Sequence, residues 1–505
     1  MSLAEVWGVV PAGISGVMVK VEVDVARGLP SVGVVGLAHT SVAEARWRAR
    51  SAIVNSGFTW PNSRITIGLS PADLPKTGTS LDLPIAVGLL AATAQIDKIA
   101  SDISFIGELG LDGAIKQVSG VLAAAITAQR HGITTFIVST GNSREASEVA
   151  GLSVIAVTNL SQLIAVLRGE NPGERVEQFA DPVHHANALG DFSEVRGHDV
   201  ARFALEVAAA GGHHCSMLGE PGVGKTMLAQ RFVSLLPALS HQQALDVTSV
   251  HALAGRIHSG HGLMRRPPFI APHHSISAGA MLGSVRNGVL LPGALTLASE
   301  GVLFLDEAPE FDRPCLEGMR QPLEQGSLAL MRVGQTVIAP ARFQLILAAN
   351  PCPCGQAIGR GDGCSCGAQQ KRRYLQKLSG PLMDRIDIRI SLTRPTDAHL
   401  RMSAGECSEV ISQRVCLARD RARVRWNEES WDLNSQAPGS ALRARYSPNI
   451  AGQVLLERAE AKGLNPRGSD RVLRMAWTLA DLQAKDQPGK EHIATALSMR
   501  GGGFE

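Results

Sequence analysis

The chain has 505 residues, of which 45% are hydrophobic and 19% are charged. This composition is typical of globular proteins and excludes wholesale disorder. At roughly 150 residues per domain, the length predicts about three domains. The net charge of +3 is too small to indicate a nucleic-acid partner by itself.

The sequence carries none of the usual signs of secretion or membrane insertion. Eight cysteines in a chain of this length are too few for a secreted disulfide framework. The N-terminus has no basic segment of the kind that opens a signal peptide. The longest apolar run, residues 83–96, covers about 14 residues and is too short to span a bilayer. We therefore expect a soluble cytoplasmic protein.

The first predicted domain, residues 1–170, alternates strand-like runs with alanine-rich helices. The expected strands are residues 16–25, 63–69 and 133–139, and the expected helices are residues 84–94 and 121–129. Proline, glycine and charged residues cluster directly afterwards, which predicts a linker at residues 171–192.

The second predicted domain, residues 193–395, is of the α/β class. The expected elements are helices at residues 199–210 and from residue 225, strands at residues 215–218, 301–305 and 343–348, and a hairpin at residues 327–339. Strands that alternate with helices predict a parallel sheet covered on both faces. Residues 396–505 are charged, and their amphipathic runs predict a helical domain.

The strongest motif is Gly219-Glu-Pro-Gly-Val-Gly-Lys-Thr226, between an apolar strand and a helix. Its glycines let the backbone wrap round a phosphate with N–H groups pointing inward, and the helix N-terminus adds its positive end. Lys225 can reach the β- and γ-phosphates, and the Thr226 hydroxyl can bind Mg²⁺. The predicted nucleotide-binding residues are Gly219, Pro221, Gly222, Val223, Gly224, Lys225, Thr226 and Met227.

A second motif is the apolar run that ends in Asp306 and Glu307. In the same sheet as the phosphate loop, Asp306 would hold Mg²⁺ through water and Glu307 would polarise the attacking water. Phosphoryl transfer depends mostly on positioning and charge stabilisation. The two motifs together therefore predict ATP hydrolysis.

Two further polar residues fit the same chemistry. Asn350 follows the next predicted strand, where its amide can bind the attacking water or the γ-phosphate; the alternative is an asparagine that only starts the Asn-Pro turn. Arg385 offers a planar cation suited to transition-state charge at a neighbouring subunit, and its alternative is a surface ion pair.

Six segments, in this order along the chain, resemble the magnesium-chelatase-like AAA+ ATPases of the ComM/YifB type. Besides the two motifs, they are Arg266-Pro-Pro-Phe-Ile-Ala-Pro-His-His274, Arg320-Gln-Pro-Leu-Glu324, Ala349-Asn-Pro-Cys-Pro-Cys-Gly355 and Ser379-Gly-Pro-Leu-Met-Asp-Arg-Ile-Asp387. The resemblance implies a Lon-protease-like α+β N-terminal domain, a central AAA+ phosphate-loop domain and a C-terminal helical lid. It also implies a hexameric ring that moves on DNA.

The resemblance assigns roles around the nucleotide. Asn350 matches sensor 1, and Arg385 matches the arginine finger. Arg467 matches sensor 2, with Arg474 as a second choice.

The resemblance also implies two elements that point into the pore of the ring. Residues 280–295 match the helix-2 insert, and residues 327–339 match the pre-sensor-1 hairpin. Arg286 and Arg332 are therefore the predicted DNA contacts; the alternative is that each is a solvated loop arginine.

The Lon-like region does not predict a protease. Lon-type hydrolysis uses a serine activated by a lysine. Ser80 occupies the serine position, but Leu122 stands at the lysine position and Lys116 lies six residues away. A serine without its base is a weak nucleophile, so we expect a non-catalytic scaffold or partner-binding domain.

Four of the eight cysteines lie within 15 residues, at Cys352, Cys354, Cys364 and Cys366. Four thiolates can hold a tetrahedral zinc ion that staples a loop. The alternatives are reduced thiols in a flexible loop, or disulfides, which the cytosol disfavours. Histidines also cluster at His251, His258, His261 and the pair His273 and His274, for which turn or capping roles are expected rather than metal binding.

The two motifs predict an ATPase that uses ATP and Mg²⁺. The resemblance further implies a hexameric helicase or translocase that acts on single-stranded or branched DNA in recombination or natural transformation, with recombination proteins as further partners. One alternative is a chelatase-type motor that drives metal insertion into a porphyrin. Another is an assembly protein that only changes shape when it binds ATP.

Overall fold

The computed structural model of the chain describes residues 2–36, 44–72, 78–170, 174–175, 190–257, 262–286, 289–332, 335–357, 364–396 and 405–501. Two compact units make up the molecule. The N-terminal unit contains Met1–Val183, His241–Met264 and Val285–Leu291, and the phosphate-loop unit contains His184–Ser240, Arg265–Ser284 and Pro292–Glu505. None of the helices in the described ranges combines the length and the apolar character that crossing a membrane requires.

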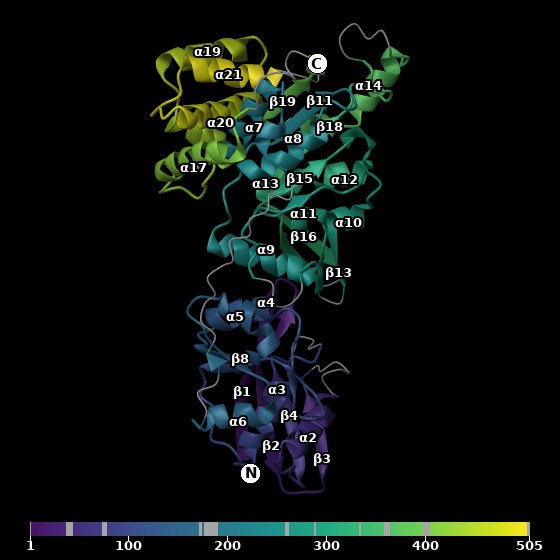
Figure 1. The fold of residues 1–505 in the computed structure, drawn as a ribbon, viewed down its shortest axis with the longest axis vertical. Coiled ribbons are helices and arrows are strands. Elements are labelled where there is room, and N and C mark those ends of the chain that lie inside the picture. Colours follow the sequence, from purple (N-terminus) through teal and green to yellow (C-terminus); the bar gives the residue numbers. More distant parts are fainter. Residues whose placement is uncertain are drawn as a thin grey trace. The chain divides into compact units, whose positions relative to one another are not determined.

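The N-terminal unit is built on a mixed eight-stranded sheet (Figure 1). In spatial order its strands are β10 (Glu174–Arg175), β9 (Ser153–Val157), β8 (Thr135–Ser139), β5 (Ile103–Phe105), β1 (Ser2–Ala12), β2 (Ser15–Ala26), β4 (Arg64–Ser70) and β3 (Ser31–Val35). The three predicted strands are confirmed as β2, β4 and β8. Strand β10 pairs with β9 and lies within the segment predicted as a linker.

Two helices cover opposite faces of this sheet, and both match predicted helices. Helix α3 (Asp82–Ala92) packs on β1, where a Cβ on Gly8 would lie 2.8 Å from Pro84. Helix α4 (Val121–Arg130) packs on the other face, where a Cβ on Gly16 would lie 3.2 Å from the Cα of Ala124. Glycine therefore permits the close approach of helix and strand on each face.

The phosphate-loop unit contains the predicted parallel sheet. Its strands, in spatial order, are β12 (Phe269–Ile270), β15 (Val302–Leu305), β18 (Gln344–Ala349), β11 (Cys215–Gly219) and β19 (Ile388–Leu392). All pairings are parallel, and β15 and β18 are buried along their whole lengths. Because parallel strands end at one edge, the loops after β11, β15 and β18 meet at their carboxyl ends.

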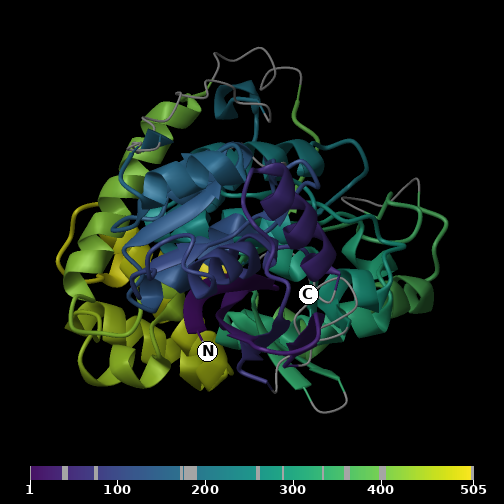
Figure 2. The ribbon, with the colours of Figure 1, turned by 90° about the horizontal axis from the view of Figure 1, so that it is seen from below.

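The C-terminal part of this unit is helical, as predicted. Figures 1 and 2 show the helices, coloured lime to yellow, gathered beside the sheet. They are α17 (Ser408–Arg425), α19 (Ile450–Ala461), α20 (Pro466–Leu482) and α21 (Lys490–Gly501). Helix α20 begins where Asn465 caps it by accepting the Gly468 N–H at 2.7 Å and proline occupies its first position.

Two short hairpins occupy the segments predicted to enter the pore. Strands β13 (Gly283–Arg286) and β14 (Val289–Pro292) pair to form the first hairpin. Along the chain they follow helix α10 (Ala278–Leu282) and precede helix α11 (Ala294–Leu297). Strands β16 (Ser327–Arg332) and β17 (Gln335–Pro340) form the second hairpin, with Arg332 paired to Gln335. Arg286 and Arg332 each end a strand, but their side chains lie outside the described part of the chain.

Candidate nucleotide site

The phosphate loop joins the carboxyl end of β11 to helix α8 (Lys225–Phe232). Gly222 and Gly224 have φ angles of 79° and 95°, a left-handed conformation that favours glycine. A Cβ on Gly219 would lie 2.9 Å from the carbonyl oxygen of Leu392. The loop therefore needs its glycines to turn the backbone into a cradle whose N–H groups, with the start of α8, can face an anion.

Lys225 is buried at the start of α8, with 8% of its surface exposed. Its Nζ donates hydrogen bonds to the carbonyl oxygens of Gly219 (2.7 Å) and Glu220 (2.9 Å). It also donates to Asn350 Oδ1 at 2.9 Å, so the structure brings these two predicted residues together. Burial lowers the pKa of Lys225, and neighbouring carboxylates oppose that shift.

Thr226 and Asp306 meet across the sheet edge. The Thr226 hydroxyl donates to Asp306 Oδ2 at 2.7 Å. The two residues follow strands β11 and β15, which are separated in the sheet by β18. Mg²⁺ prefers oxygen ligands and is usually held by one or two protein oxygens together with the phosphates of its substrate. The hydroxyl and carboxylate at this point fit that requirement.

Glu307 has an unusual backbone conformation, with φ 50° and ψ 44°. This left-handed geometry is strained for a residue other than glycine, and such strain clusters at functional sites. The Glu307 N–H donates to Asp306 Oδ1 at 3.0 Å, and its carboxylate lies 3.5 Å from Nδ1 of His274. His274 thus adjoins the predicted base, a contact that sequence reasoning missed.

Two other neighbours of the site were also missed. Nε2 of His198 lies 3.0 Å from the carbonyl oxygen of Val223 in the phosphate loop, and burial lowers the His198 pKa, so the neutral ring donates. Tyr374, from helix α14 (Ala368–Gln376), is hydrogen-bonded to the backbone of Asn350, and burial raises its pKa to about 12. Both residues lie outside the motifs that predict the nucleotide site. The one sequence signal was that His198 directly precedes the helix predicted at residues 199–210.

The predicted arginine finger and the two sensor-2 candidates differ in accessibility. Arg385 is 7% exposed and donates to Glu324 Oε1 and to the carbonyl oxygen of Pro381. Arg467 is exposed in the first turn of α20, where a neighbouring subunit could reach it. The second choice, Arg474, is largely buried and donates to the carbonyl oxygen of Ala437 at 2.8 Å; its burial lowers its pKa to about 10.

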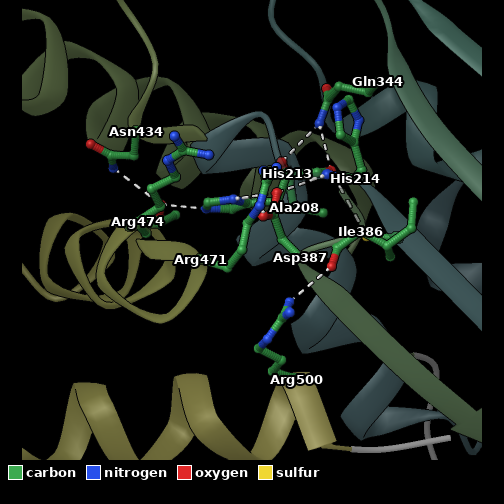
Figure 3. A network of polar contacts seen from close by, with 12 residues as sticks. Ala208, His213, His214, Gln344, Ile386, Asp387, Asn434, Arg471, Arg474 and Arg500 are labelled. Atoms are coloured by element: carbon green, nitrogen blue, oxygen red, sulfur yellow. Dashed lines mark hydrogen bonds and ion pairs between the residues drawn. The ribbon is translucent and has the colours of Figure 1, made fainter. Parts of the chain in front are cut away.

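A buried polar network ties the start of β19 to helix α20 (Figure 3). Asp387 is fully buried, with Oδ1 3.0 Å from Arg471 and Oδ2 3.2 Å from His213 Nδ1. His213 Nε2 lies 2.7 Å from the Thr478 hydroxyl on α20. Burial would raise the Asp387 pKa, but Arg471 and the histidines hold it well below its usual range. The network therefore links the segment that carries Arg385 to the helix that begins near Arg467.

His214 completes this network as a neutral ring. Its backbone N–H donates to Asp387 Oδ2 at 3.3 Å, and its Nδ1 accepts the N–H of Leu345 at 3.1 Å. Burial lowers the pKa of His214 to about 4, which agrees with an unprotonated Nδ1.

The four clustered cysteines come together. The Sγ atoms of Cys352, Cys354, Cys364 and Cys366 all lie within 4.8 Å of one another. In the chain ranges that the structure describes, this is the one group of three or more histidine, cysteine or acidic side chains with metal-binding spacing. All four are free thiols, so they do not form the disulfides considered as an alternative.

The histidines behave differently from one another. His251 is buried, and His258 and His261 lie outside the described residues. Nδ1 of His273 lies 2.8 Å from the Ser275 hydroxyl and accepts the Ser275 N–H at 3.3 Å, which confirms the turn role predicted for it.

The Lon-like serine has no basic partner among the residues that the structure describes. Ser80 is 4% exposed, and its hydroxyl has no hydrogen-bond partner among the described residues. Leu122 is buried on α4, and Lys116 is exposed on strand β7 (Ile115–Lys116). The nearby buried acid Asp82 is paired with Arg48 at 2.6 Å.

The fold and the site define a phosphate-loop nucleotide-binding module of the AAA+ class. The chain also matches three sequence families: "Subunit ChlI of Mg-chelatase" over residues 21–142, "Magnesium chelatase, subunit ChlI" over residues 191–400 and "Magnesium chelatase, subunit ChlI C-terminal" over residues 405–500. These matches cover both units and the helical C-terminal part.

Full-length relatives narrow the class further. An uncharacterised protein of Mycobacterium tuberculosis is 43% identical over 503 residues, covering 99% of each chain. YifB of Escherichia coli is 38% identical over 504 residues, covering 99% of this chain and 97% of YifB. The competence protein ComM of Haemophilus influenzae is 38% identical over 508 residues, covering 99% of this chain and 98% of ComM. The chain belongs to the ComM/YifB family of magnesium-chelatase-like AAA+ proteins.

Proposed function

We propose that the chain hydrolyses ATP and uses the energy to move on DNA. The observation that carries the ATPase is the convergence of Lys225 on Asn350 and of Thr226 on Asp306, each within 2.7–2.9 Å. When bound, Mg²⁺ neutralises charge on the phosphates. Glu307 orients the attacking water, and Asn350 positions it relative to the γ-phosphate.

A neighbouring protomer completes the pocket in this proposal. Arg385 leaves Glu324 and inserts its guanidinium beside the transferred phosphate of the next subunit, and Arg467 contacts the same nucleotide as sensor 2. The proposal therefore requires a closed ring, and we take it to be a hexamer because the family resemblance implies one.

Movement on DNA is supported by the whole-length likeness to a relative named a competence protein. The first strands of the two hairpins, β13 and β16, end at Arg286 and Arg332. We place these two arginines in the pore as contacts to DNA phosphates. Natural transformation or a related recombination process in the cytoplasm, with recombination proteins as partners, is the setting that this activity fits. The proposal also includes a structural zinc ion at Cys352, Cys354, Cys364 and Cys366.

Two alternatives predict different outcomes. The names of the matched families favour a chelatase-type motor, which would hydrolyse ATP without any response to DNA. An ATP-switched assembly protein would keep its activity after Glu307→Gln, because that variant still binds ATP.

The deciding experiment is ATP-dependent unwinding of three-way and four-way DNA junctions by the purified chain. We expect strand exchange with Mg²⁺-ATP and none with Lys225→Ala or Glu307→Gln. DNA that neither binds the chain nor raises its ATPase rate would refute the DNA assignment and leave the ATPase standing.

A further inference from the structure

The spacing of the sulfur atoms in the cysteine cluster fits a single metal ion. Three of its Sγ–Sγ distances are 3.3 Å (Cys352 to Cys354), 3.7 Å (Cys352 to Cys364) and 3.6 Å (Cys354 to Cys364). A zinc ion with Zn–S bonds of about 2.3 Å has its sulfur atoms about 3.8 Å apart. The thiols are therefore already spaced for one ion, and a four-cysteine donor set is typical of structural zinc.

The cysteine cluster also adjoins the phosphate loop. Its first turn closes through the Gly355 N–H, which donates to the carbonyl oxygen of Cys352 at 2.9 Å. A Cβ on Gly355 would lie only 2.5 Å from the ring of Pro221 in the phosphate loop. The metal-binding turn and the phosphate loop are thus in direct contact.

The positions of two of the cysteines along the chain also connect the cluster to the nucleotide site. Cys352 is two residues after Asn350, which accepts the Lys225 hydrogen bond. Cys366 directly precedes Gly367, the N-cap of α14. Helix α14 also carries Tyr374, which is hydrogen-bonded to the backbone of Asn350. An ion held by all four sulfurs would therefore fix the end of β18 to the start of α14.

The same helix reaches the acidic motif. Lys377, directly after α14, forms an ion pair with Glu310 at 3.3 Å, and Glu310 lies three residues after Glu307. The cysteine segment is accordingly connected to the phosphate loop, the Asn350 strand end and the turn that follows Glu307.

We propose that a zinc ion bound by Cys352, Cys354, Cys364 and Cys366 holds the phosphate loop and Asn350 in their nucleotide-binding positions. Metal occupancy then sets nucleotide affinity: the loaded chain binds nucleotide tightly and the metal-free chain binds it weakly. This inference rests on the proposed nucleotide site but not on DNA or on turnover.

The test compares zinc content with nucleotide affinity in the full chain. Zinc per protomer is measured by elemental analysis, and affinity is measured by titration with a fluorescent ADP analogue. The double variant Cys354→Ser/Cys366→Ser is expected to lose the ion and to bind the analogue about tenfold more weakly, because small displacements of positioning groups have effects of this size or larger. Cys407→Ser, an exposed cysteine outside the cluster, is the matched control and should change neither quantity.

A second variant tests the contact between Gly355 and Pro221 separately from the zinc ion. Gly355→Ala keeps all four thiols, so it should keep its zinc, yet its new Cβ meets Pro221 and its φ of 81° is unfavourable for alanine. We expect weaker analogue binding with full zinc occupancy. Cobalt substituted into wild type and Gly355→Ala should give the visible spectrum of a tetrahedral thiolate site in both.

Three results would overturn the inference. A folded wild-type chain that takes up no zinc from a zinc-containing buffer removes the metal site. Unchanged affinity in Gly355→Ala, or in wild type stripped of zinc by a chelator, removes the coupling even where the double cysteine variant does not fold. Failure of the loaded wild type to bind the analogue at all would instead refute the nucleotide site on which the proposed function rests.

Discussion

The two units treat their reactive side chains in opposite ways. In the phosphate-loop unit, Lys225 and Thr226 each meet a predicted partner within 2.9 Å at one edge of the sheet. In the N-terminal unit, Ser80 is buried and its hydroxyl has no partner in the described part of the chain. A reactive residue type is therefore informative only where the fold supplies its partners.

The units also differ in how they bury carboxylates. Asp387 in the phosphate-loop unit is surrounded by Arg471 and histidines, which lower its pKa. Glu145 in the N-terminal unit is half-buried and accepts a hydrogen bond from Asn142, and the loss of solvent around it raises its pKa to about 7. These two carboxylates should consequently contribute to the pH dependence of stability with opposite signs.

The largest expected effect is at Arg385, the proposed arginine finger. Arg385→Ala should reduce the ATP turnover rate by about 10³–10⁵-fold while leaving nucleotide binding intact, and Arg385→Lys should not restore it. Glu324→Gln removes only the partner of Arg385 and should remain active. Mixing Arg385→Ala with Lys225→Ala subunits should recover turnover, because each supplies what the other lacks; no recovery would argue against a shared pocket.

Glu307→Gln should reduce turnover by about 10²–10⁴-fold, the usual contribution of a general base. Binding of the fluorescent ADP analogue should be unchanged, because the cradle and Lys225 remain. His274→Ala, which removes the neighbour 3.5 Å away, should have a much smaller effect on rate. Equal losses in the two variants would show that Glu307 alone does not account for the activation of the water.

Asp387→Asn should lower the free energy of unfolding of the phosphate-loop unit by about 3–5 kcal/mol, because it leaves the partly buried Arg471 without its carboxylate. Its depressed pKa means that Asp387 stabilises the fold above about pH 4, the unfolded value, and loses this contribution as pH falls further. Urea unfolding of the variant should therefore be less acid-sensitive than that of wild type. Asp486→Asn, at an exposed site, is the control and should match wild type.

Glu145→Gln should have a smaller effect of opposite sign in the N-terminal unit. The raised pKa means that the folded state binds the proton more tightly, so stability declines as pH rises from 4.5 to about 7. The glutamine variant should lose this decline and be more stable above pH 7 by on the order of 1–3 kcal/mol. Hydrogen exchange followed by peptide mass spectrometry can assign the change to this unit; a decline that persists in the variant would contradict the assignment.

The sequence predicted the local parts of the nucleotide site well. The phosphate loop needs glycines at fixed spacings, so Gly222, Gly224 and Lys225 are recognisable without the fold. His198, His274 and Tyr374 were missed because each reaches the site from an element that only the tertiary structure brings close.

The elements of the fold were likewise predicted where the signal is local and missed where it depends on tertiary packing. Long periodic segments such as β2 and α3 were predicted, but strand β1 was not, because Gly8 and Pro11 interrupt its pattern. Gly8 is present because helix α3 packs against it, a reason invisible in the sequence. Likewise, the clustering of the cysteines was readable, whereas the contact of Gly355 with Pro221 was not.

The most direct test of the account is the steady-state ATP hydrolysis rate of Lys225→Ala beside that of Ser80→Ala. We predict that the first variant loses hydrolysis and that the second keeps the wild-type rate, since Lys225 lies in the proposed reaction centre and Ser80 lies in the other unit. Wild-type hydrolysis by Lys225→Ala, or its loss in a folded Ser80→Ala chain, would contradict this conclusion.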